Sequence, residues 1–76
     1  MNTAGLIDEA VDLMERGKDG QASHVLLTAA IECDDPALAP RIRELGEQGL
    51  GRAGRFRRGN WNEIVKLADA RVGAPV

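Results

Sequence analysis

The sequence predicts an all-α fold of four antiparallel helices, arranged as two stacked helical hairpins. Apolar residues recur at intervals of three and four in four segments, and no run alternates with period two beyond a few residues. Turn signals at Gly17, Pro36 and Gly59 separate the segments. A chain of 76 residues predicts one domain, 1–76. The predicted helices span about residues 4–16, 20–33, 37–57 and 61–72, and a frayed tail follows at 73–76.

The segment 20–33 is the helix around which the others are expected to pack. It is apolar on almost every side, and a helix of this kind is normally buried against several neighbours. With Phe56 and Trp61 as the only aromatic residues, the core is built mainly from aliphatic side chains, which suit helices better than strands. One apolar stripe of this helix consists of Ala22, Val25, Leu26, Ala29 and Cys33. A second stripe beside the first consists of Leu27, Ala30 and Ile31.

The first hairpin has recognisable boundary residues. Asn2 or Thr3 is positioned to cap the first helix, and Gly17 follows that helix as the residue expected in the left-handed conformation. Asp19 is the expected cap of the second helix. The second helix should stop before Pro36, because the residue preceding a proline disfavours helical geometry.

The third segment contains four glycines, Gly46, Gly49, Gly51 and Gly54, within a helical apolar stripe. Each glycine in a helix interior costs roughly 0.5–1 kcal/mol relative to alanine. Either close packing against a neighbour compensates, or the helix ends near residue 48 and a basic loop follows. We favour a helix that continues to about residue 57.

The fourth helix has the clearest start signal in the chain. Asn60 is a good N-cap residue, and Glu63 lies three residues further on, as in a capping box. The residues predicted to form the apolar face of this helix are Trp61, Ile64, Val65, Ala68 and Val72.

The first hairpin also carries a spaced pattern of large and small residues. Its first helix has a large residue, a small one four positions on, a large one three further and then glycine: Leu6, Ala10, Leu13 and Gly17. Its second helix has alanine, a large residue and alanine: Ala22, Leu26 and Ala29. This pattern resembles a tetratricopeptide repeat, in which small residues let two helices approach and large ones fill the groove.

The resemblance implies a protein–protein binding module that uses a concave helical surface for a peptide. It is looser elsewhere: Glu9 stands where the family usually has an apolar residue, the closing proline is displaced to Pro36, and only Leu45 and Gly46 represent the pattern in the second half. About three repeats are usually needed for stability. With two helix pairs, we therefore expect a homodimer in which a second copy supplies the missing neighbour.

Composition places the protein in the cytoplasm. Cys33 is the only cysteine, so no intramolecular disulfide is possible and a reducing compartment is the simplest interpretation. No charged-then-apolar leader opens the sequence. No apolar run approaches the roughly 18 residues of a membrane span, so we expect no membrane partner.

The net charge of −2 conceals an asymmetry between the two halves of the chain. Residues 1–35 carry eight acids and two bases, a net −6, whereas residues 36–76 carry eight bases and four acids, a net +4. Such a division serves self-complementary packing, self-association or an acidic partner. In the alternative interpretation, the two halves neutralise each other within the fold.

No group of residues points to catalysis, a metal or another cofactor. His24 is the only histidine, and a metal site would need further ligands. We expect His24 to be partly buried in helix packing or at its edge, and Cys33 to be a small buried apolar side chain. Asp35 is expected to cap a helix end. The sequence therefore predicts a protein that is not an enzyme and has no cofactor.

The most distinctive feature is the segment 52–61, which combines four arginines with two aromatic residues. The arginines can bind an acidic protein or a second copy, or they can bind nucleic-acid phosphates while a ring stacks on a base. In a third interpretation, Phe56 and Trp61 are core residues at a helix junction and the arginines form a solvated or helix-end face. The predicted partner-binding residues are Arg52, Arg55, Arg57, Arg58 and Trp61.

Two functional hypotheses follow from this segment. The first is a small non-catalytic adaptor or regulator that binds an acidic protein partner or itself. The second is a nucleic-acid-binding regulator that uses the same residues. The acidic character of the whole chain, with an isoelectric point of about 5.3, counts against the second hypothesis.

Overall fold

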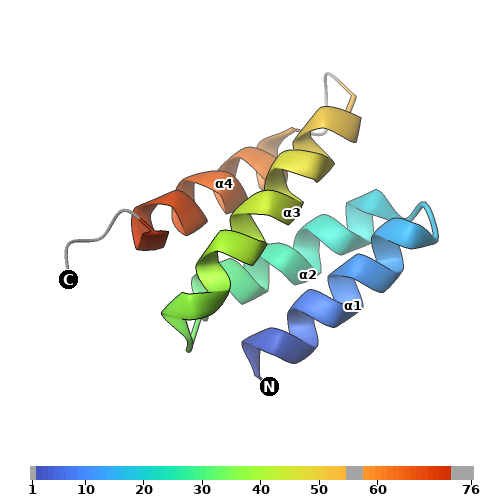
Figure 1. Ribbon diagram of the computed structural model, residues 1–76. Coiled ribbons are helices and arrows are strands. Elements are labelled where there is room, and N and C mark those ends of the chain that lie inside the picture. Colours follow the sequence, from blue (N-terminus) through green and yellow to red (C-terminus); the bar gives the residue numbers. More distant parts are fainter. Residues whose placement is uncertain (1, 55–57, 73–76) are drawn as a thin grey trace.

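The computed structural model describes residues 2–54 and 58–72, and within them the chain forms four α-helices and no strand. α1 (Thr3–Glu15) and α2 (Asp19–Ile31) form the first hairpin, and α3 (Ala39–Arg52) and α4 (Gly59–Val72) form the second. A 3₁₀ turn, Pro36–Leu38, leads into α3. The predicted all-α architecture of two helical hairpins is confirmed (Figure 1). The predicted frayed tail at 73–76 lies outside the described residues.

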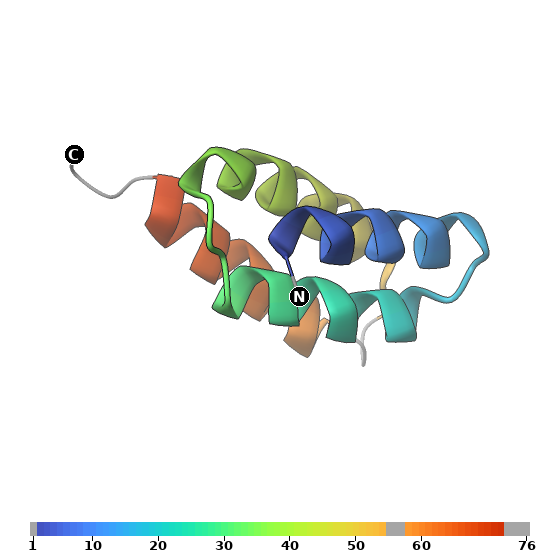
Figure 2. The ribbon, with the colours of Figure 1, turned by 90° about the horizontal axis from the view of Figure 1, so that it is seen from below.

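The two hairpins stack on each other. α1 and α3 run in the same general direction and form one layer, while α2 and α4 form the other (Figures 1 and 2). α2 packs against α1, α3 and α4, and its Ala22, Leu26 and Ala29 are completely buried. This confirms α2 as the helix around which the others pack. Its end is an exception, because Ile31 is 57% exposed.

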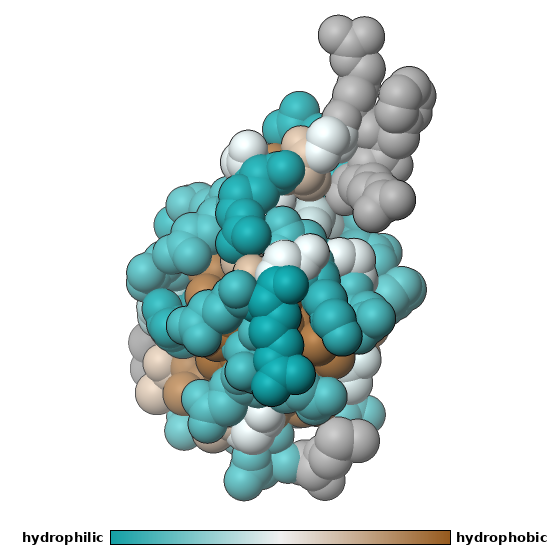
Figure 3. Space-filling model, turned by 90° about the vertical axis from the view of Figure 1, so that its right-hand side faces the viewer, coloured by the Kyte–Doolittle hydropathy of each residue, from teal (hydrophilic) through white to brown (hydrophobic). Residues whose placement is uncertain are grey.

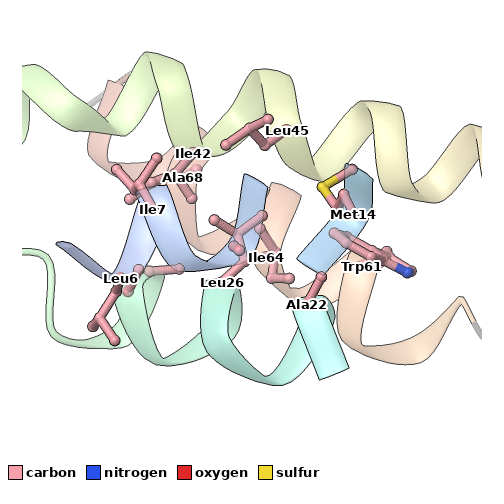
Figure 4. Close-up of a cluster of buried hydrophobic side chains, with 13 residues drawn as sticks. Leu6, Ile7, Met14, Ala22, Leu26, Ile42, Leu45, Trp61, Ile64 and Ala68 are labelled. Atoms are coloured by element: carbon pink, nitrogen blue, oxygen red, sulfur yellow. The ribbon is translucent and has the colours of Figure 1, made fainter. Parts of the chain in front are cut away.

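The core contains side chains from all four helices. Leu26 of α2 and Ile64 of α4 lie at its centre, and Trp61 of α4 lies near Met14 of α1 at one end (Figure 4). Trp61 is only 2% exposed. The prediction that Val72 belongs to the buried face of α4 is wrong, because its side chain at the end of the helix is 47% exposed.

The predicted signals at the two ends of α1 are confirmed. The side-chain oxygen of Asn2 accepts a hydrogen bond of 2.6 Å from the amide of Gly5 and so caps α1. Gly17 has φ of +76°, the left-handed conformation expected after α1. Thr3 is buried instead of capping, and its Oγ1 accepts a hydrogen bond of 3.1 Å from the amide of Asp34. This bond joins the start of α1 to the chain just beyond α2.

The predicted cap at Asp19 is wrong. α2 begins at Asp19 itself, with Lys18 in the N-cap position and no side-chain hydrogen bond there. The carboxylate of Asp19 lies instead 3.2 Å from the guanidinium of Arg52 at the end of α3. A contact between hairpins has replaced a local cap.

The predicted capping box of α4 is also wrong. α4 begins at Gly59, and the carbonyl of Arg58 accepts the first helical hydrogen bond. Asn60 therefore lies inside the first turn. Its side-chain amide donates to Ser23 Oγ of α2 at 3.3 Å. The side chain that could have capped its own helix bonds to a neighbouring one.

α3 is shorter than the predicted helix 37–57. The 3₁₀ turn precedes α3. Asp35 caps the start of this turn, because its Oδ1 accepts a hydrogen bond of 3.0 Å from the amide of Ala37. α3 ends at Arg52, because Ala53 is extended with φ of −70° and ψ of 139°. The prediction of helix is thus wrong at residues 53 and 54, and residues 55–57 lie outside the described part of the chain.

Close packing compensates for two of the four glycines in this segment. A Cβ added at Gly46 would come within 2.9 Å of Ile64 Cγ2, and one added at Gly49 would overlap the ring of Trp61. A Cβ at Gly51 or Gly54 would meet open space. The first two glycines let α3 and α4 approach closely. α3 ends shortly after the last of these contacts.

Arg71 ties the end of α4 to the end of α2. Its Nε donates to the carbonyl of Ala30 at 3.2 Å, and its Nη2 donates to the carbonyl of Ile31 at 3.1 Å. The last carbonyls of a helix have no partner within the helix, and a cation is favoured at this end of the helix dipole. Arg71 is therefore a C-terminal cap for α2 that comes from the other hairpin.

Replacing Arg71 by alanine should lower the free energy of unfolding by about 1–2 kcal/mol, because it leaves two carbonyls without these donors. Urea denaturation followed by circular dichroism measures the change. Lys66→Ala is the matched control, because Lys66 is exposed on the same helix; it should change stability by less than about 0.5 kcal/mol. Equal losses in the two variants would contradict the capping role.

Candidate protein-binding site

One end of the molecule is hollowed into a groove of about 920 Å³, which we call the end groove. Residues 17–21 of the α1–α2 turn and the start of α2 line it, together with residues 52–54 after α3 and residues 59–61 of α4. Ser23 and His24 of α2 complete the lining. This end of the molecule is mostly hydrophilic, with small hydrophobic areas between the polar side chains (Figure 3).

Arg52 is positioned at the end groove by contacts with the first hairpin. Its Nη2 donates to the carbonyl of Met14 at 3.2 Å and lies 3.2 Å from Asp19 Oδ1. Among the described residues, Asp19 Oδ1 is shielded from solvent and accepts no hydrogen bond, so its contact with Arg52 is an attraction between charges. The side chain of Arg52 remains 49% exposed. Arg52 therefore supports the fold and also presents positive charge at the groove.

Ser23 and Asn60 fix the two helix starts at the groove. Ser23 is 5% exposed, and its Oγ donates to the carbonyl of Gly20 at 2.7 Å while accepting the bond from Asn60. The starts of α2 and α4 therefore meet at the same groove. The N-terminal end of a helix carries partial positive charge from its free amide groups. Both helix ends thus favour negative charge in the groove.

The predicted partner-binding residues occupy three different kinds of position. Arg52 lines the end groove. Arg58 is exposed, and it directly precedes Gly59, which also lines the groove. Trp61 borders the groove but is buried in the core. It therefore does not share the accessible surface of the arginines. Arg55 and Arg57 lie outside the described residues, as does Phe56.

His24 and Cys33, the remaining candidates for chemistry, do not lie together. His24 is exposed at the edge of the end groove, so of the two expected positions, within the helix packing or at its edge, the first is wrong. Cys33 is half-buried, and its Sγ donates to the carbonyl of Asp35 at 3.3 Å. In the described part of the chain, no three His, Cys, Asp or Glu side chains are grouped so that they could hold a metal ion.

Sequence reasoning missed Lys18, Gly20 and Ser23 as parts of this site. All three lie at the start of α2, and Lys18 takes the N-cap position without making a side-chain hydrogen bond there. Lys18 thus adds a third positively charged side chain near the groove, beside Arg52 and Arg58. The signal was present in the sequence as an uncapped helix start between two glycines, Gly17 and Gly20.

None of the helices in residues 2–54 and 58–72 is both long and apolar enough to cross a membrane. A scan against protein-family models found no matching family, and neither a search of curated proteins nor a search of solved structures found a significant match.

Proposed function

We propose that the protein is a small non-catalytic adaptor or regulator that binds an acidic segment of a partner protein in the end groove. The observation that carries this proposal is the gathering of positively charged groups and helix starts at this groove. Two helix N-termini meet at the groove, Lys18 and Arg52 line it, and Arg58 lies beside it. The carboxylates of an acidic segment fit these donors, and arginine binds carboxylates with particular geometric specificity.

A protein partner suits this groove better than nucleic acid. Asp19 lies within the groove and offsets part of the charge of Arg52, and the whole chain is acidic with an isoelectric point of about 5.3. Binding to nucleic-acid phosphates draws on several uncompensated bases. The resemblance of the first hairpin to a tetratricopeptide repeat supports a protein partner as well. We place the protein in the cytoplasm on the basis of its single cysteine.

The experiment is a fluorescence-polarisation titration with a labelled peptide of glutamate, aspartate and serine, repeated at low and high salt. We expect binding that weakens with salt, since exposed charges are screened. Lys18→Glu with Arg58→Glu should raise the dissociation constant at least about tenfold, because it reverses two of the positive charges at the groove. Arg52 is left unchanged, because its contacts with Met14 and Asp19 support the fold.

The matched control is Arg43→Glu with Lys66→Glu. It changes the net charge by the same amount at two exposed residues that do not line the end groove. Equal loss of affinity in both double variants would reject the end groove as the site. A single-stranded oligonucleotide that binds more tightly than the peptide, with a steeper dependence on salt, would replace this proposal by nucleic-acid binding.

A further inference from the structure

A second groove lies between α1 and α3, on the layer that these two helices form. Its volume is about 240 Å³. Val11 and Met14 of α1 and Leu45 of α3 give it an apolar floor. We call it the α1–α3 groove. Arg52, at one end of it, is the only described residue that lines both this groove and the end groove.

The two walls of the α1–α3 groove carry opposite charges. Residues 4, 8, 11 and 15 share one side of α1, because they are spaced by about one helical turn, and they bring Asp8 and Glu15 to the first wall. Residues 41, 45, 48 and 52 have the same spacing on α3 and bring Arg41 and Arg52 to the second. One wall is therefore acidic and the other is basic.

The acidic and basic walls do not neutralise each other across the groove. Among residues 2–54 and 58–72, no ion pair joins α1 to α3. Arg52 lies against Asp19 of α2, and Arg41 lies 3.5 Å from Glu44 of its own helix. No ion pair involves Asp8 or Glu15 within the same part of the chain. Their charges are available to a molecule that covers the groove.

We infer that a second copy of this chain covers the α1–α3 groove, related to the first by a two-fold axis that runs along the groove. This operation places the acidic α1 wall of each copy on the basic α3 wall of the other. The interface is then self-complementary, as a two-fold dimer requires. A two-fold axis running across the groove would instead place α1 on α1 and oppose acid to acid, which charge complementarity disfavours.

The register along the groove fits this arrangement. Arg52 donates to the carbonyl of Met14, so Arg52 and Glu15 lie at the same level along the groove. A two-fold axis along the groove preserves that level. Glu15 of one copy therefore faces Arg52 of the second copy, and Asp8 lies within reach of the long side chain of Arg41. The apolar floors meet between these charged walls.

Sedimentation of the full chain at low and high salt tests this dimer. We expect a dimer at low salt whose dissociation constant rises with salt. The acid-wall variant is Asp8→Lys with Glu15→Gln, and the basic-wall variant is Arg41→Glu with Gln48→Glu. Glu15 is made neutral and not positive, because it faces Arg52, which neither variant changes. Each alone should raise the dissociation constant at least about a hundredfold, because two-fold symmetry doubles every change. Mixed in equal amounts, the two variants should form a heterodimer, because their walls are again complementary.

The matched control is Glu9→Lys with Glu63→Lys, two exposed residues that do not line the groove; it should leave the dimer intact. A monomeric wild-type chain at low salt, equal dissociation of the control, or failure of the folded variants to form a heterodimer would each overturn the inference. Oligomers that grow beyond a dimer would overturn the two-fold arrangement. Binding of the acidic peptide to the basic-wall variant tests the end groove separately, so the two proposals can fail independently.

Discussion

Replacing Gly49 by alanine should lower the melting temperature by about 10 °C, although alanine is the better helix former. A Cβ at this position would overlap the ring of Trp61, which is 2% exposed and held among other core side chains. Overpacking of a core typically costs about 1–3 kcal/mol, which exceeds the gain in helix propensity. Thermal denaturation followed by circular dichroism and by the fluorescence of the single tryptophan measures the effect.

Gly51→Ala is the control for this prediction. It makes the same chemical change two residues further along α3, where an added Cβ meets nothing within 4 Å. Its stability should stay the same or rise by up to about 1 kcal/mol, because only helix propensity changes. If Gly49→Ala were as stable as Gly51→Ala, the close approach of α3 and α4 at Trp61 would be refuted.

Replacing Trp61 by alanine should lower the free energy of unfolding by about 3–5 kcal/mol. Trp61 is the largest buried side chain and contributes to the core near Met14 and Ala22 (Figure 4). A domain of this size has a total stability of about 4–11 kcal/mol. The variant should therefore be largely unfolded at physiological temperature, which the loss of helical circular dichroism would reveal.

Val72→Ala provides the comparison on the same helix. Val72 is 47% exposed, so its truncation should change stability by no more than about 0.5 kcal/mol. A double-mutant cycle with Trp61→Leu, which keeps an apolar side chain in the core, then tests the contact between the two residues. Gly49→Ala should lower stability little in the Trp61→Leu background, because the ring atoms that the added Cβ would overlap are absent there; this corresponds to a coupling energy of about 1–3 kcal/mol. Additive effects would show that the two residues do not share a contact.

The helix boundaries that rest on local interactions were predictable from the sequence. Asn2 caps α1 and Gly17 takes the left-handed conformation after it, because both depend only on residues within one turn. Asp19 and Asn60 have the same capping chemistry, yet each is drawn to a partner on another helix. Such competition depends on side chains more than 30 residues away, which a local pattern does not contain.

The candidate site was only partly predictable. Arg52 and Arg58 of the arginine-rich segment lie at one end of the molecule, near the starts of two helices, and their role in binding stays a prediction. Trp61 is predicted both on the apolar face of the fourth helix and among the partner-binding residues, and its burial confirms the first prediction. Lys18 and Ser23 joined the site because the first hairpin folds back against the second.

The sequence by itself determined that this protein is all-helical, because apolar spacing, turn residues and the left-handed glycine act over a few residues at a time. It also determined that α2 is central, since few other solutions bury a helix that is apolar on nearly every side. Only the tertiary structure decided which glycines of α3 are contact points, which capping side chains join the hairpins, and which charges meet at a groove. Those outcomes depend on distances between helices, and no local spacing of residues encodes such distances.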